Sequence, residues 1–360
     1  FINSKGVIMK KELLMASALV STLGAASVAN AVTATMSGSH HVGQEFDSPD
    51  SGGNTNSTIN QSSFSVALSE TTDGGTTISS SFMLQNESGG IDNDTSIKLT
   101  FTDGSALEIL NAGNASGTHD VSIPGAGGEQ GVAGTTTANA PTGLDFATPS
   151  TTFGVEWHSA ADFLMDGLKV SASYSGDSGV AKANTARADS SFGIGATYVT
   201  TAGDSTVTIG AGFADSTTNT KSVQPSADAG GMHIGVTAVT GDLTIGVGYA
   251  DGDTIVDDGA TVALANTQVD GSVLKAGIKY VSGDITLNIG AKSGEAKDSS
   301  TEGTAGTTDD SWDEVNASVS YAVASGVTAT LGYTNVDVQD EGTSVNDGGS
   351  AWYIGASMSF

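Results

Sequence analysis

Apolar residues recur at every second position in short segments along the chain from Val32 onward. Ser, Thr, Gly, Lys and His fill the positions between them, as in residues 168–174, 285–291 and 352–360. A period of two is that of a β-strand with one apolar face and one polar face. The pattern therefore predicts an all-β protein in which each strand presents a single apolar side.

Two kinds of connection alternate between these segments. One kind is the tight turn, in which Gly beside Asp or Ser supplies the positive φ angle that a hairpin requires. Seven such turns occur, at Asp73-Gly74-Gly75, Asp103-Gly104, Asp166-Gly167, Gly203-Asp204, Gly241-Asp242, Gly283-Asp284 and Ser325-Gly326. The other kind is longer and rich in Asp, Gly, Ser and Thr, as in residues 175–190, 214–230, 250–270, 293–311 and 336–350. Seven turns join fourteen strands in pairs, and one strand at each terminus makes sixteen.

An even number of strands, with short turns at one end and long loops at the other, is typical of an outer-membrane barrel. A strand of roughly nine residues tilted by about 40° rises about 23 Å, close to the ~25 Å apolar band of such barrels. Aromatic rings fall near the two strand ends, where membrane interfaces favour them; they are Tyr174, Phe213, Tyr249 and Tyr333 at one end and Tyr198, Tyr280 and Tyr321 at the other. We therefore predict a transmembrane antiparallel up-and-down β-barrel with short periplasmic turns, long external loops and a water-filled lumen.

The first residues have the pattern of an export signal. Met9-Lys10-Lys11-Glu12 gives a positive start, an apolar run follows, and Ala29-Asn30-Ala31 matches a cleavage site. We expect residues 9–31 to be a signal peptide cleaved near Ala31 and residues 32–360 to form the barrel. Residues 1–8 are interpreted as a translated segment upstream of the Met9 start. An N-terminal membrane anchor is the alternative for the apolar run.

Composition removes several classes of function. The absence of cysteine excludes disulfides, thiol chemistry and Cys-bearing zinc sites. The chain has 40 acidic and 12 basic residues, and Arg187 is its one arginine, so we expect no nucleic-acid partner. No nucleophile–base set stands out, so we predict no enzyme, no cofactor and no metal site. Crowded loop acids such as those in residues 251–258 would allow loosely bound calcium.

The last ten residues, Ala351-Trp352-Tyr353-Ile354-Gly355-Ala356-Ser357-Met358-Ser359-Phe360, carry a family resemblance. They resemble the terminal strand of Gram-negative porins, which ends in Phe after alternating apolar residues. The signal peptide, the first strand from Val32 and the sixteen-strand count are also similar to general porins, especially alphaproteobacterial ones. The resemblance implies a homotrimer of water-filled barrels in the outer membrane. It also implies that Phe360, with Met358 and Trp352, forms the signal read by the outer-membrane assembly machinery.

In porins the third external loop folds into the barrel and narrows it. Here the fifth strand, near Ala106 to Leu110, is followed by an irregular stretch at about residues 111–150, which occupies that place in the order. The resemblance therefore predicts a pore-constriction loop that carries His119, Asp120, Glu129 and Asp145, with its acids lining one side of the constriction. The alternative is an exposed surface loop with solvated acids.

The alternation of side chains along the strands predicts which residues line the wall of the lumen opposite the loop. If the apolar residues face lipid, the basic residues between them face the lumen, because charge on the lipid face costs ~2–4 kcal/mol at the midplane. These expected pore-lining residues are Lys98, Lys169, His158, His233, Lys275, Lys279 and Lys292. Family porins set an arginine cluster against the acidic loop, whereas this chain has no arginine in any predicted strand. A transverse field would therefore be weaker and based on lysine.

The combined pattern predicts a porin for passive diffusion of small hydrophilic solutes and ions. The formal charge of −28 concentrates cations at the pore mouth, which predicts a preference for cations. A secreted acidic calcium-binding β-rich adhesin or surface-layer protein is the alternative, although no short repeat supports it. An outer-membrane enzyme barrel would need a nucleophile and a base, and neither His158 nor His233 has an evident partner in the sequence.

Overall fold

The computed structural model describes residues 32–50, 52–85, 90–92, 96–109, 114–128, 154–176, 188–218, 227–256, 267–298, 309–339 and 348–360. The expected signal peptide and its cleavage position lie outside these residues. No helix among the described residues is long and apolar enough to cross a membrane.

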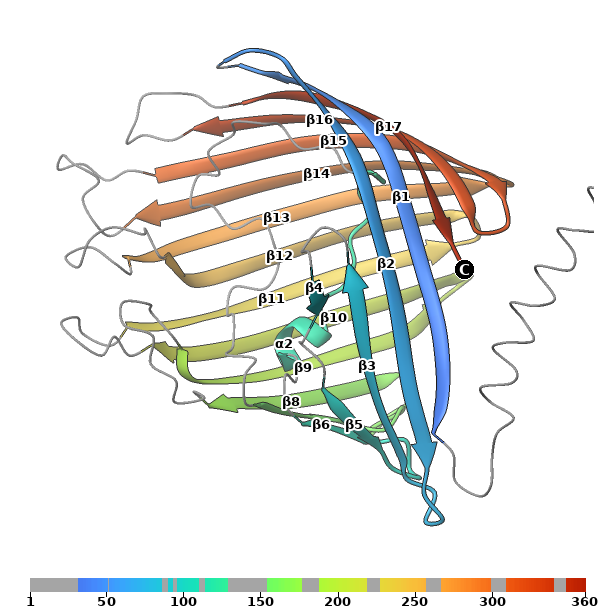
Figure 1. The fold of residues 1–360 in the computed structure, drawn as a ribbon. Coiled ribbons are helices and arrows are strands. Elements are labelled where there is room, and N and C mark those ends of the chain that lie inside the picture. The colour runs from blue at the N-terminus through green and yellow to red at the C-terminus, as the bar shows by residue number, and fades with distance from the viewer. Residues whose placement is uncertain are drawn as a thin grey trace, which may run out of the picture.

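The described strands form one closed antiparallel sheet (Figure 1). They are β1 (Thr33–Pro49), β2 (Thr55–Thr71), β3 (Thr77–Gln85), β4 (Gly90–Asp92), β5 (Ile97–Thr100), β6 (Ala106–Ile109), β7 (Gly154–His158), β8 (Leu168–Gly176), β9 (Ala188–Ala202), β10 (Ser205–Thr218), β11 (Ala227–Thr240), β12 (Leu243–Val256), β13 (Thr267–Ser282), β14 (Ile285–Asp298), β15 (Asp309–Ala324), β16 (Val327–Gln339) and β17 (Gly349–Ser359). Both β4 and β5 pair with β3, so they are two pieces of one strand. The predicted sixteen-strand barrel is therefore confirmed.

The first and last strands close the barrel. β1 pairs with β17 from Ser39↔Ser359 to Pro49↔Gly349. Beyond the last paired residue, Gly38 and Phe360 exchange two backbone hydrogen bonds of 3.2 and 3.1 Å. The terminal Phe360 thus extends the seam to the rim of the barrel.

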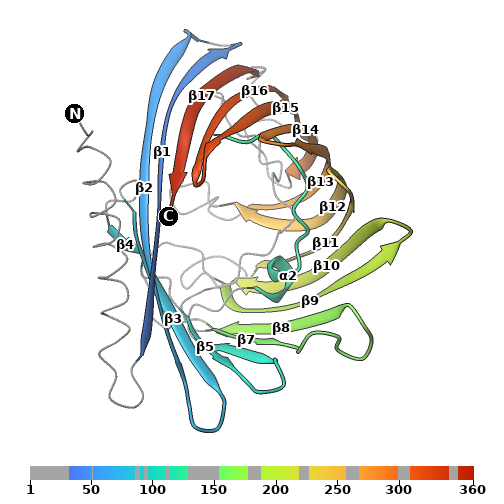
Figure 2. The ribbon, with the colours of Figure 1, turned by 90° about the vertical axis from the view of Figure 1, so that its right-hand side faces the viewer.

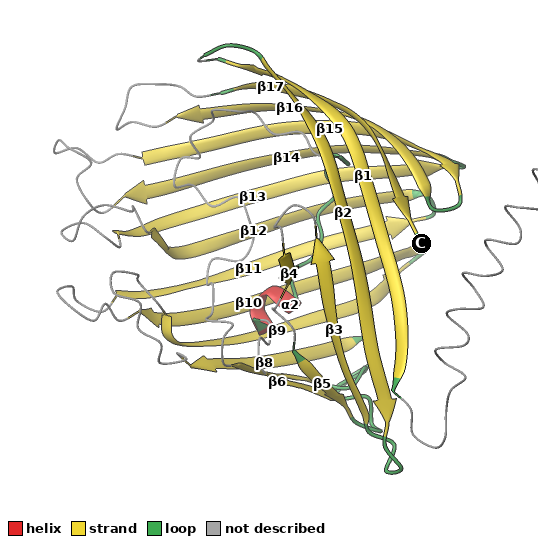
Figure 3. Ribbon diagram, viewed as in Figure 1, coloured by secondary structure: helices red, strands yellow, loops and turns green. Residues whose placement is uncertain are grey.

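All seven tight turns occur where the sequence predicts them (Figure 3). Each contains a glycine with positive φ, namely Gly75, Gly104, Gly167, Gly203, Gly241, Gly283 and Gly326. Each strand pairs with its neighbour in sequence, so successive connections lie at opposite ends of the barrel. Their lengths alternate less strictly than expected, because the β7–β8 connection at the turn end spans residues 159–167 and the β1–β2 connection at the loop end spans only residues 50–54.

The strands are longer than the expected nine or so residues. β9 to β16 each run for 13 to 16 residues. Residues 251–256, for example, were expected in a loop but continue the ladder between β12 and β13. Pairing extends past the apolar band because water can solvate polar side chains there while the backbone groups remain paired.

The two faces of the wall differ as the alternation predicts. Leu274, Ile278 and Tyr280 of β13 are 49%, 45% and 44% exposed on the outer face. Gly277, between them in sequence, lies against Pro124 of the third external loop on the inner face. The apolar residues therefore face outward to lipid, and the interior is lined by small and polar residues.

We expect the turn glycines to differ in how well they tolerate a side chain. At Gly167, φ is +80° and an added Cβ would collide with the Val199 carbonyl oxygen, whereas at Gly203 φ is +62° and an added Cβ would have no atom of the described residues within 4 Å. Gly167→Ala should lower the free energy of unfolding by at least ~1–2 kcal/mol, because the left-handed conformation alone costs an L-residue that much. Urea unfolding in detergent would measure this.

The matched control is Gly203→Asn, because Asn tolerates the left-handed region and meets no neighbour at that turn. Its unfolding midpoint should stay close to that of the parent protein. Equal destabilisation by both substitutions would contradict the assignment of the Gly167 turn as the more constrained one.

Candidate functional site

A short helix, α2 (Ala115–Thr118), lies inside the barrel near the start of the third external loop (Figure 2). Asn114 caps it by accepting the backbone N–H of Ser116 at 3.0 Å. The backbone N–H of Ala115 donates to Ser173 Oγ on β8 at 2.9 Å. The helix is therefore fixed to the inner wall where the loop enters the lumen.

His119 follows the helix and anchors it a second time. Its Nδ1 lies 2.7 Å from Thr197 Oγ1 and its Nε2 lies 2.9 Å from Ser171 Oγ. The residue is only 5% exposed. His119 thus lies in the part of the third external loop that is inside the barrel. Its ring faces the wall and not the open lumen, because both ring nitrogens bond to inward-facing hydroxyls.

Glycines on the inner wall make room for the loop. An added Cβ at Gly195 would lie 2.6 Å from His119 Cδ2, and one at Gly246 would lie 2.8 Å from Pro124 Cδ. Real Cβ atoms do not approach other atoms so closely. Because glycine permits such close approach, the loop lies flat against the strands.

The rest of the described loop crosses the wall toward β15. Ile123 packs against the buried side chains of Ala250 and Val273. The backbone N–H of Ala126 donates to Asn316 Oδ1 at 2.6 Å, and that of Gly127 donates to Ser318 Oγ at 2.7 Å. Side-chain acceptors on β15 therefore hold the loop at the far end of its path.

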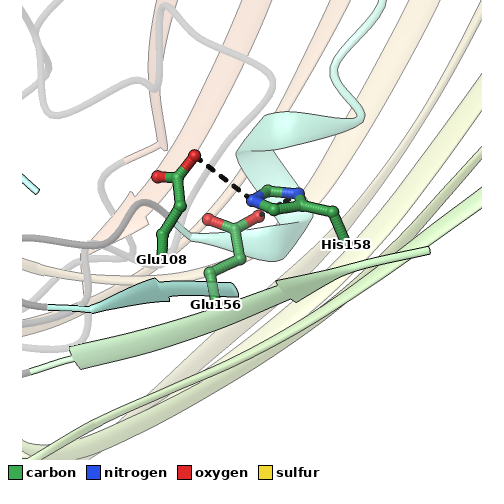
Figure 4. A group of neighbouring side chains, drawn as sticks. All are labelled: Glu108, Glu156 and His158. Carbon is green, nitrogen blue, oxygen red and sulfur yellow. Dashed lines mark ion pairs between the residues drawn. The ribbon is translucent and has the colours of Figure 1, made fainter. Parts of the chain in front are cut away.

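A charged cluster lies on the wall where the loop begins (Figure 4). Glu108 of β6 and Glu156 of β7 are direct cross-strand partners. Lys98 of β5 forms an ion pair with Glu108 at 2.7 Å. His158 lies beside both carboxylates, with Nε2 3.4 Å from Glu108 Oε1 and Nδ1 3.6 Å from Glu156 Oε1. Thr118 of α2 donates to Glu156 Oε1 at 2.6 Å, so the cluster also binds the loop.

A second charged group lies on β13 to β15. Lys275 and Lys292 are direct cross-strand partners, and Lys292 forms an ion pair with Glu314 at 2.7 Å. Asn316 Nδ2 also donates to Glu314 Oε1 at 2.6 Å. Asp120, which is exposed on the loop, interacts electrostatically with Lys275. Asp120 is the one acidic residue in the described part of the loop.

The structure places the seven expected wall residues on the inner face; they are Lys98, Lys169, His158, His233, Lys275, Lys279 and Lys292. Of the expected loop residues, His119 and Asp120 are described, whereas Glu129 and Asp145 lie outside the described residues. At the seam, Trp352, Met358 and Phe360 are 51%, 46% and 80% exposed on the outer face.

Sequence reasoning missed Glu108 and Glu156, and it found no partner for the two lumen histidines. The structure corrects that expectation, because His158 lies between the two carboxylates and His233 Nε2 donates to the Ser116 carbonyl at 2.8 Å. The alternation of side chains could have indicated that both acids face the lumen, since each lies between outward apolar residues, as Glu156 does between Val155 and Trp157. Their proximity was hidden because the long loop separates them in sequence.

The docking of the loop should depend on pH. Burial, with the positive charges of His158, His233 and Lys169, lowers the pKa of His119 to about 4. In a released loop the ring would titrate near its ordinary value of ~6.5. Docking should therefore be strongest above about pH 6.5 and weaken as the pH falls toward 4, because protonation then favours release. Current noise in planar bilayers would report this change.

The control variant is His119→Gln, which keeps a polar side chain but cannot titrate. Its current noise should vary less between pH 7 and pH 4 than that of the parent channel. An identical pH dependence in the two proteins would show that His119 does not control docking.

Comparison with known proteins agrees with this geometry. No curated protein sequence matches the chain significantly. An anion-selective porin from Comamonas acidovorans is 10% identical, covers 92% of this chain and 100% of its own, and has a TM-score of 0.61. The trimer form of OmpT, an outer membrane protein of Vibrio cholerae, is 17% identical, with coverages of 92% and 100% and a TM-score of 0.60.

A porin structure refined at 1.8 Å is 19% identical, covers 91% of this chain and 100% of its own, and has a TM-score of 0.57. At these identities the likeness concerns the fold alone. The family profile described as Gram-negative porin, however, matches residues 16–341, which is most of the sequence. With a closed sixteen-strand barrel and an inward-folded third loop, the chain belongs to the Gram-negative porin family.

Proposed function

We propose that this outer-membrane porin passes small hydrophilic solutes and ions by passive diffusion and prefers cations to anions. The observation that carries the proposal is the closed barrel with a polar inner face, across which residues 114–128 lie as an internal loop. A water-filled lumen needs no solute-specific chemistry, so we propose no enzymatic activity. The closed barrel and the family match do not favour the alternative of a secreted calcium-binding adhesin.

The proposed cation preference rests on the charge balance of the whole chain. The formal charge is −28, whereas the described wall contains lysines that partly balance its own acids. From Val32 onward, the residues outside the strands include 20 of the 39 acidic residues and only three of the nine basic ones, so they carry somewhat more than half of the net negative charge. Acids at a pore mouth raise the local cation concentration, because the low-dielectric surroundings focus their field. The anion-selective relative has the same fold, so selectivity has to come from charge.

At the constriction, we propose that Asp120, Glu129 and Asp145 line one side of the passage. On the wall, Lys169, Lys275 and Lys279 would face them with lysine charge in place of an arginine cluster. Two further expectations stay predictions: cleavage of the signal peptide near Ala31, and reading of the Trp352–Phe360 strand by the assembly machinery. Loosely bound calcium among the loop acids also stays a prediction.

Planar bilayers with a potassium chloride gradient would test both conduction and selectivity. We expect stepwise conductance and a reversal potential of cationic sign at low salt. Because mouth charges are exposed, the preference should shrink as the salt concentration rises from 0.1 to 1 M, where the Debye length falls from about 10 to about 3 Å. Silent membranes would overturn the channel, and an anionic reversal potential would overturn the cation preference alone.

We also propose that three copies assemble, as in the trimer form of OmpT. A polar patch on the outer face supports this, because lipid would solvate it poorly. The patch comprises His40 and Gln44 of β1 with Thr58, Asn60 and Ser62 of β2. Internal hydrogen bonds link His40 to Ser62 at 2.8 Å and Thr58 to Gln44 at 3.2 Å. Contact with a second copy would shield these groups from acyl chains.

A bulky substitution in the patch should separate the subunits. We expect Ser62→Trp to run as a monomer on semi-native gels, because the indole would prevent close approach of the polar faces. Ala276→Trp, on the outer face of β13, is the matched control and should remain trimeric. Trimers in both variants would place the interface elsewhere.

A further inference from the structure

Two carboxylates face each other on the inner wall without a hydrogen bond between them. Glu108 and Glu156 are direct partners across β6 and β7, and Glu156 is only 1% exposed. Like charges directly opposite each other destabilise a sheet. Lys98 neutralises Glu108, but the buried Glu156 carboxylate receives its hydrogen bond only from the neutral hydroxyl of Thr118 among the described residues. The cluster therefore favours a further cation near Glu156.

The imidazole of His158 is oriented toward these carboxylates (Figure 4). Its Nε2 is buried, has no hydrogen-bond partner among the residues that the structure describes, and lies 3.4 Å from Glu108 Oε1. Its Nδ1 is held by Ser171 Oγ at 3.0 Å. With Nδ1 protonated and donating to Ser171, the lone pair of Nε2 points into the carboxylate cluster.

The distances argue against a simple ion pair of His158. Charge-assisted hydrogen bonds between nitrogen and carboxylate are about 2.7–2.9 Å long, as the Lys98–Glu108 pair is at 2.7 Å. The Nε2 atom of His158 lies 3.4 Å from Glu108 Oε1, whereas the 3.6 Å contact with Glu156 Oε1 is made by Nδ1. Two ligands that share a tetrahedral zinc ion, each about 2.0–2.2 Å from it, lie roughly 3.3–3.6 Å apart, so it is the separation of Nε2 from Glu108 that matches a shared ion.

We propose that Glu108, Glu156 and His158 Nε2 bind a divalent transition-metal ion such as Zn²⁺ on the inner wall. Each residue offers one ligand atom, and the three atoms lie within 4.8 Å of one another. One imidazole with two carboxylates suits Zn²⁺, whereas Ca²⁺ and Mg²⁺ prefer all-oxygen sites. Ser171 fixes the ring as a partner of the unbound nitrogen. The proposal goes beyond diffusion through the pore and does not depend on it.

The metal site would also hold the third loop. Thr118 of α2 bonds to Glu156, and Ser171 Oγ is shared between His158 and His119 of the loop. A metal that fixes Glu156 and His158 therefore orders one group to which the loop bonds directly and the partner of another, Ser171. Occupancy of the site would stabilise the docked loop.

Titration of the purified full-length barrel in detergent with Zn²⁺, after treatment with a chelator, would test the proposal. Calorimetry at neutral pH should show one saturable Zn²⁺ site per barrel. When Co²⁺ replaces Zn²⁺, the protein should gain a visible absorption band characteristic of cobalt bound by few ligands. Glu156→Gln and His158→Gln should each weaken binding at least tenfold. Lys98→Met should tighten it, because the ammonium of Lys98 competes for Glu108.

Matched controls lie elsewhere on the same wall. Glu314→Gln disrupts a Lys–Glu pair of the same 2.7 Å length that has no histidine, and His41→Gln removes an inward histidine of β1. Both should leave Zn²⁺ affinity unchanged. Heat-dependent gel mobility would establish that every variant is folded.

Three results would overturn the site: no saturable Zn²⁺ binding by the folded barrel, unchanged affinity in His158→Gln, or Ca²⁺ binding as tight as that of Zn²⁺. Conductance steps measured in the same preparation would show whether the channel itself works. Failure of the metal site can therefore be distinguished from failure of the proposed channel, because the pore does not require the metal. Greater resistance of the docked loop to proteolysis with Zn²⁺ would support the anchoring role, and equal resistance in His158→Gln would oppose it.

Discussion

Backbone hydrogen bonding is the constraint on which the rest of this structure depends. Within a bilayer no water is available to an unpaired N–H or C=O group, so a sheet that spans it has to close on itself. The pairing of β1 with β17, extended by Gly38 and Phe360, removes the last free edge. Once the wall is closed, each strand has one face toward lipid and one toward the lumen, and the alternation of side chains follows from that division.

Closure leaves an interior that cannot be filled as a globular core is filled. The inner faces consist of glycines, hydroxyl residues and a few charges, and the loop lies against them through directed hydrogen bonds to Ser171, Ser173, Thr197, Asn316 and Ser318. A single bond of this kind contributes only about 0.5–1.5 kcal/mol net. Several of them, distributed from β8 to β15, are required to hold a loop that has little apolar surface to bury.

Charge is arranged in two ways in this molecule. On the wall, Lys98 pairs with Glu108 and Lys292 with Glu314, so these groups largely satisfy one another at short range. Somewhat more than half of the net negative charge from Val32 onward lies outside the strands, where water solvates it. Local pairing governs how the loop is held, whereas the summed charge governs which ions gather at the mouth. The two effects respond differently to salt, because only exposed charges are strongly screened.

The sequence alone determined the strand count, the seven turns and the face of each strand that meets lipid, because alternation and turn glycines are local properties. It also indicated which stretch would enter the lumen, through a family resemblance. It underestimated strand length, because polar residues such as those at 251–256 can extend a ladder as readily as they form a loop. Only the tertiary structure turned His119 toward the wall and brought Glu108 opposite Glu156 beside His158. The register between β6 and β7 places Glu108 opposite Glu156, although a long loop separates the two strands in sequence. Neither periodicity nor composition encodes this register.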